Sequence, residues 1–108
     1  MKLLHEILGH DLMGKVHQSR MLYPEGFFHW LQFNDHVWIQ FEKYANTMAA
    51  KRERFSARTI IEVMRWNNDI REKNVLFKLS NNNVPGLARL WMAKYGQNHP
   101  KFFQLQEK

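Results

Sequence analysis

The sequence contains no cysteine and no long apolar run in its 108 residues. The lack of cysteine excludes disulfides, thiolate nucleophiles and the usual structural zinc ligand sets, and it fits a reducing compartment. The longest apolar runs have a few residues, against the ~20 that a membrane-spanning helix needs. The first residues also lack the uninterrupted apolar core of a signal peptide. We therefore expect a soluble, cytoplasmic protein with no membrane partner.

Sequence motifs of catalysis are absent as well. The chain has no glycine-rich phosphate loop and no serine in a nucleophile elbow, and its acidic residues are sparse and scattered. His5 and His10 are five residues apart, which does not place both imidazoles on one helical face as the zinc-protease motif does. We expect a protein without enzymatic activity, metal or cofactor.

What the sequence does contain is apolar material for a folded core. Hydrophobic residues make up 44% of the chain and aromatic residues 14%, in a length typical of one domain. We expect a single domain over residues 1–108. It would consist of an N-terminal helix and aromatic segment at 1–33 and a basic helical module at 34–108.

The positive charge is concentrated in the second half of the chain. Residues 1–50 contain four Lys/Arg and five Asp/Glu, a net charge of −1, whereas residues 51–108 contain twelve and five, a net charge of +7. A basic surface of this kind attracts polyanions and speeds encounters with them. The asymmetry favours nucleic acid or an acidic protein surface as the partner, although a generic basic surface is the plain alternative.

Hydrophobic residues at helical spacing predict three to four helices, and the most regular pattern follows the N-cap candidates Asn34 and Asp35. Ser56 and Asn83 are expected to cap two later helices, and Gly96 to end the last one in the left-handed conformation. The predicted helices cover Lys2–Val16, His36–Lys51, Ala57–Asn67 and Gly86–Tyr95.

Two segments have the pattern of short strands. Val75–Ser80 alternates, and Phe102–Leu105 is a candidate closing strand, while Phe27–Phe33 fits either a short strand or a helix edge. The expected fold class is α+β, mainly α, with three to four helices and a small two- or three-stranded sheet. The element order is partly winged-helix-like, by analogy with folds whose last helix enters the major groove of DNA.

The first candidate binding face lies on the helix that follows Ser56. Arg58, Glu62 and Arg65 share one face of that helix, with Arg52 and Arg54 just upstream. The arginines are placed either to reach a phosphate backbone or to form intrahelical ion pairs with Glu62. We leave both interpretations open here.

The second candidate face combines three asparagines with the last helix. Arg89 shares its face with Gly86 and Ala93, so a large partner surface could approach closely there. A helix N-terminus also offers free amides to a phosphate. Alternatively, the asparagines only form the turn and Arg89 pairs with an acid. We expect Asn81, Asn82 and Asn83 to contact the nucleic-acid backbone or base edges, and Arg89, together with Lys78, to contact phosphate.

A distinctive string of residues runs from about Asn34 to Phe103, over about two-thirds of the chain. Its members are Asn34, Val37, Phe41, Phe55-Ser56-Ala57-Arg58, Arg65-Trp66, Phe77-Lys78, Asn81-Asn82-Asn83, Ala88-Arg89 and Phe102-Phe103. In this string the sequence resembles a family of small, mostly uncharacterised bacteriophage and prophage proteins. The family usually has an arginine soon after the paired aromatics, where this chain continues with Gln104. The resemblance implies a phage accessory protein and no established activity.

These observations lead to one functional hypothesis and two alternatives. The leading hypothesis is a phage-derived, non-enzymatic accessory protein that binds nucleic acid, DNA rather than RNA, through its basic helical face. The first alternative is an inhibitor of a host defence system, of the anti-CRISPR or anti-restriction type, that binds an acidic host protein. The second is a structural homodimer formed through exposed Phe27, Phe28 and Trp30.

Overall fold

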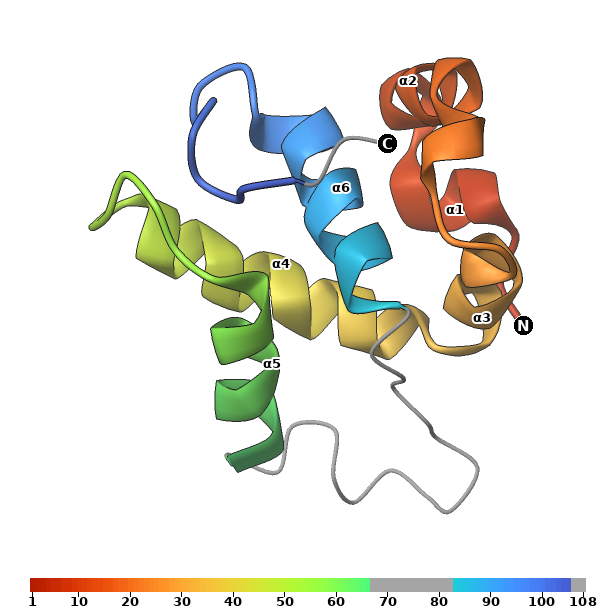
Figure 1. Cartoon of the computed structure of the whole chain (residues 1–108). Helices are drawn as coiled ribbons and strands as arrows, with labels where there is room; N and C mark the ends of the chain where they lie inside the picture. The colour runs from red at the N-terminus through yellow and green to blue at the C-terminus, as the bar shows by residue number, and fades with distance from the viewer. Residues whose placement is uncertain (67–82, 106–108) are drawn as a thin grey trace.

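The structure is a computed structural model, and it describes residues 1–66 and 83–105. These residues form α-helices, with one 3-10 helix between the second and third (Figure 1). In chain order the helices are α1 Leu4–Leu8, α2 His10–Gln18, η1 Arg20–Leu22, α3 Phe27–Phe33, α4 Asp35–Ala49, α5 Ala57–Trp66 and α6 Val84–Tyr95.

The last helix, α6, lies at the centre of the fold. It contacts α2, α4 and α5, and Figure 1 shows α4 and α5 on one side of it and the N-terminal helices on the other. Leu87, Leu90 and Trp91 of α6 are completely buried. They belong to one hydrophobic cluster that takes residues from every α-helix, so both halves of the chain share a core.

The segment after α6 folds back over the core and meets the connector between α4 and α5. Phe102 and Phe103 pack against Trp91, with ring centroids 4.8 and 5.3 Å away. The Phe55 amide donates a hydrogen bond to the Phe102 carbonyl at 2.9 Å, and the two rings stack. The connector and the C-terminal segment are thereby held side by side.

The predicted sheet is wrong for the part of the chain that the structure describes. No strand occurs in residues 1–66 or 83–105, Phe27–Phe33 is helix α3, and Val75–Ser80 lies outside the described residues. Phe102 and Phe103 show why the closing strand fails. Successive side chains of a strand point to opposite faces, whereas both of these consecutive rings are buried in the same cluster. The described residues form an all-helical fold. The winged-helix analogy is therefore wrong as well, because it requires the predicted sheet.

Glycines explain two further differences from the predicted helices. The helix expected over Lys2–Val16 breaks at Gly9, whose φ of +83° leaves the helical region and separates α1 from α2. Gly96 ends α6 with φ −62°, so its expected left-handed conformation is wrong. Its lack of a side chain matters for another reason, because a Cβ there would overlap the Met92 carbonyl oxygen.

The predicted start of α5 is confirmed. Ser56 Oγ accepts a hydrogen bond from the Thr59 amide at 3.3 Å, which satisfies one of the free amides of the first turn. Ile60, Ile61 and Met64 are buried as the helical spacing predicted, whereas Val63 is exposed. This cap fixes the direction in which α5 leaves the connector, and so the position of Arg58.

Candidate nucleic-acid interface

Three of the predicted site residues, Arg54, Arg58 and Arg89, line one open groove of about 1410 Å³. Four parts of the chain form its walls. They are the loop at 22–25, the connector and α5 start at 54–58, the first turns of α6, and the C-terminal segment at 100–105. We call this hollow the basic groove. Its walls come together because Phe55 and Phe102 join the connector to the C-terminal segment.

The charge of the basic groove is strongly positive. Among the described residues that line it, Arg54, Arg58, Arg89 and Lys101 face one carboxylate, that of Glu25, for a net charge of +3. Sequence reasoning missed Lys101. No periodicity or motif marks this lysine, and its place in the groove depends on the return of the C-terminal segment after α6.

Three acidic residues outside the groove lining form ion pairs with other cations of the fold. Lys2 pairs with Asp35 at 3.2 Å, Arg65 with Glu62 at 2.9 Å, and Lys94 with Glu42 at 2.5 Å. Among the described residues, no ion pair involves Arg54 or Arg58, and both side chains are exposed. These two guanidinium groups can therefore meet an external anion without breaking an ion pair of the described fold.

Arg89 and Lys101 differ in how firmly the protein holds them. Arg89 is half-buried and lies near the Tyr23 hydroxyl. Burial raises the pKa of Tyr23 to about 12, although the nearby Arg89 charge acts to lower it. Lys101 lies 3.7 Å from Glu53 in a highly exposed pair, and such pairs contribute about 0–1 kcal/mol. A phosphate can compete for Lys101 at little cost.

The starts of two helices also border the basic groove. Ser56, Ala57 and Arg58 belong to the start of α5, and Val84 and Pro85 to the first turn of α6. The N-terminal end of a helix carries a partial positive charge and free amides, which adds to the attraction for anions. The helix termini and the basic side chains therefore both favour a negatively charged ligand.

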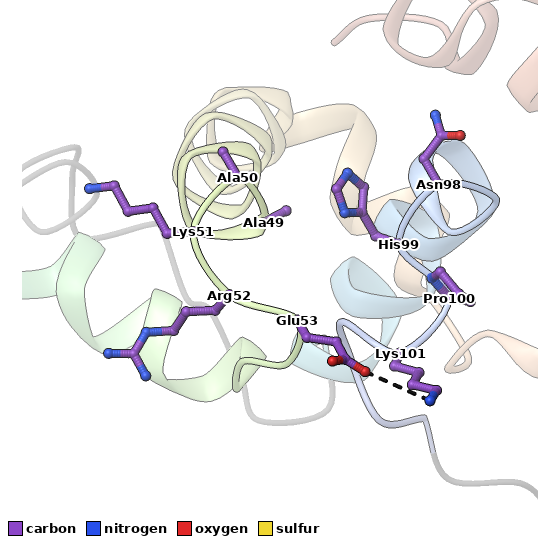
Figure 2. Close-up of a pocket in the computed structure, with 9 residues that line it drawn as sticks. All are labelled: Ala49, Ala50, Lys51, Arg52, Glu53, Asn98, His99, Pro100 and Lys101. Carbon is purple, nitrogen blue, oxygen red and sulfur yellow. Dashed lines mark ion pairs between the residues drawn. The ribbon is translucent and has the colours of Figure 1, made fainter.

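A smaller hollow of about 550 Å³ adjoins the groove, and the two share Pro100 and Lys101. Figure 2 shows Lys51 and Arg52 pointing away from this hollow, while Glu53 reaches across to Lys101. Arg52 lies over the Phe55 ring, with its guanidinium carbon 5.9 Å from the ring centroid. Arg52 therefore lies outside the basic groove. The smaller hollow, which Glu53 lines, is less suited to an anion.

Two further predicted residues that the structure describes, Arg65 and Asn83, do not line the groove. Arg65 pairs with Glu62 on α5, as the ion-pair interpretation predicted. Asn83 is buried at the start of α6, and its side chain makes no capping hydrogen bond. Lys78, Asn81 and Asn82 lie outside the described residues.

Two premises taken from the sequence are wrong. Gly86 is buried with the ring of Phe27 directly against it, so α3, and not a partner, makes the close approach to α6. Phe27 and Phe28 are buried and Trp30 is partly buried, which removes the exposed aromatic patch proposed for a homodimer. These aromatic side chains form core contacts with one another and with Tyr23.

Comparisons of the chain with protein-family models, curated proteins and solved structures found no match. The resemblance to phage proteins therefore stays a prediction, and a functional proposal must rest on the groove. In the described parts of the chain, no helix is long and apolar enough to cross a bilayer. No group of three His, Asp or Glu side chains in those parts is placed to hold a metal ion.

Proposed function

We propose that the protein binds nucleic acid, and DNA in particular, through the basic groove. The observation that carries the proposal is that Arg54, Arg58, Arg89 and Lys101, from three separate segments, line one hollow. Glu25 is the one acidic residue among the described residues of this lining, and the exposed Glu53 pairs only weakly with Lys101. Core packing holds these segments in place, so the cations are gathered before any ligand arrives. Phosphate groups are the ligands that such an arrangement attracts most strongly.

The expected salt dependence follows from the number of cations. Four phosphate contacts predict that the logarithm of the binding constant falls with the logarithm of salt concentration at a slope of roughly −3 to −3.5. Between about 50 and 200 mM salt, this slope corresponds to a loss of roughly 50- to 150-fold in affinity. Fluorescence anisotropy of a labelled DNA measures this directly.

A matched pair of variants locates the binding surface. Arg58→Gln removes an exposed charge from the groove, and we expect the slope to become shallower by about 0.7 to 0.9. Lys43→Gln removes one exposed charge from α4, away from the groove lining, and should leave the slope near the wild-type value. If DNA does not bind at low salt, or if both variants weaken binding equally, the proposal is wrong.

An inhibitor that binds an acidic host protein is the second candidate. The supporting observation is the apolar part of the groove lining, which includes Leu22, Pro85 and Leu105 beside the arginines. An acidic segment with apolar side chains would use both features. This function would be favoured if the protein does not bind DNA but captures a bacterial protein from nuclease-treated lysate, and if the Arg58→Gln variant no longer captures that protein.

A further inference from the structure

We infer that the basic groove accepts a single strand of DNA in preference to a duplex. This inference rests on the proposed function and specifies its ligand. A protein that reads the bases of duplex DNA through the major groove, which is about 12 Å wide, inserts a protruding helix or β-ribbon into it. Here Arg54, Arg58 and Lys101 surround a hollow, and they come from a connector, the first turn of a helix and a C-terminal segment.

The size of the groove favours a polymer that can enter it. Its volume of about 1410 Å³ exceeds the range of about 300–1,000 Å³ that is typical of small-molecule pockets. A duplex keeps its bases stacked inside and presents a convex surface. A single strand is flexible and narrow enough to follow a recessed path between cations.

The lining of the groove also suits exposed bases. Besides the cations, the walls include apolar side chains that remain accessible, among them Leu22, which is 45% exposed, and the exposed Pro85. In a single strand the apolar faces of the bases are free to pack on such surfaces, whereas in a duplex they are stacked on each other. The cations would hold the phosphates while the apolar wall receives the bases.

The same lining favours DNA over RNA. Ser56 and Gln104 are the uncharged polar side chains among the described residues that line the groove. A ribose 2′-hydroxyl that enters an apolar wall without a hydrogen-bond partner costs free energy, and deoxyribose avoids this cost.

The test compares matched oligonucleotides on the full-length protein. We would titrate fluorescein-labelled strands of about 12 nucleotides, a length within the usual site size of single-strand binders. The probes are a thymidine strand, a mixed-sequence duplex of the same length, and a deoxyuridine and a uridine strand that differ in the 2′-hydroxyl. We expect the single strand to bind at least about 10-fold more tightly than the duplex, and deoxyuridine more tightly than uridine.

Two neighbouring residues provide the variant and its control. Leu22 lines the groove, whereas Met21 is 93% exposed and does not. Leu22→Ser should weaken single-strand binding about 3- to 10-fold with an unchanged salt slope, because it removes apolar contact and no charge. Met21→Ser should bind like the wild-type protein. Circular dichroism checks that both variants are folded.

The outcomes separate this inference from the proposed function. Duplex binding as tight as single-strand binding, or an unchanged affinity in Leu22→Ser, would overturn the single-strand assignment and leave DNA binding intact. Tighter binding of uridine than of deoxyuridine would overturn the choice of DNA. The absence of binding to all four probes at low salt would overturn the proposed function itself.

Discussion

Replacing Gly86 with alanine should destabilise the protein, although alanine is the better helix former. A Cβ built at Gly86 would lie 2.6 and 2.8 Å from Cε1 and Cγ of the buried Phe27 ring. Carbon atoms in contact are normally about 3.5–4.0 Å apart, so the ring or α6 must move by roughly 1 Å. Overpacking of this kind costs about 1–3 kcal/mol, and the helix propensity of alanine returns up to about 1 kcal/mol. Because the ring is completely buried and three of its atoms lie within 3 Å of the added Cβ, we expect the upper part of this cost and a net loss of about 1–2 kcal/mol.

Urea unfolding followed by circular dichroism measures this loss, and thermal unfolding should show a midpoint lower by about 4 °C or more for each kcal/mol. Gly14→Ala is the matched control. Gly14 lies inside α2, and a Cβ there would meet no atom within 4 Å. The control should therefore stabilise the protein by up to about 1 kcal/mol.

A double-mutant cycle identifies the partner of the clash. Phe27→Leu alone should lower stability because the ring is completely buried. In the Gly86→Ala background the smaller side chain makes room for the new methyl group. The stability lost by the double variant should therefore be smaller than the sum of the two single losses, by at least about 0.5 kcal/mol. A Gly86→Ala variant as stable as the wild type, or strictly additive losses, would refute the packing of α6 on α3.

Two further predictions concern buried polar groups. The Tyr23 hydroxyl is buried without a hydrogen-bond partner among the described residues, so Tyr23→Phe should leave stability at pH 7 within about 0.5 kcal/mol or raise it. The pKa of Tyr23 rises from 10.0 to about 12 on folding, so with rising pH the unfolded chain loses the proton before the folded protein does. The free energy of unfolding of the wild type should therefore fall between pH 10 and 12, and more steeply than that of Tyr23→Phe, as measured by urea unfolding. The Asn46 side-chain oxygen accepts a hydrogen bond from the indole Nε1 of buried Trp91 at 2.9 Å. Asn46→Ala removes this acceptor and should lower the free energy of unfolding by about 1–2 kcal/mol, whereas Asn46→Asp keeps an oxygen there and should lower it less. Equal losses in the two variants would refute the role of the hydrogen bond.

The helices were predictable where the apolar spacing extends over several turns. α4 is the clearest case, because Val37, Trp38, Phe41 and Ala45 recur at helical spacing and all are buried. Short apolar runs were not predictable in this way. The pattern Phe102-Phe103 fits a strand as well as an irregular segment, and only its packing on Trp91 decides between them.

Part of the candidate site was predictable from charge together with a helix-capping residue. Arg54 and Arg58 were found because the second half of the chain is basic and because Ser56 marks the start of a helix. The groove itself was not predictable, since it needs the C-terminal segment to return beside the connector. A small residue such as Gly86 also gives no sign of which surface will approach it, and here that surface is the protein's own Phe27.

The two halves of the chain have different roles in the groove. All four described cations of the groove come from the basic second half, but the position of Arg89 depends on the first half, because α6 packs on α2 and its Gly86 lies against Phe27 of α3. Arg54 and Lys101 are kept together by the Phe55–Phe102 contact, which anchors both segments on the aromatic cluster around Trp91. Since mutually repelling cations would separate in a flexible chain, this apolar support is what allows them to face one ligand.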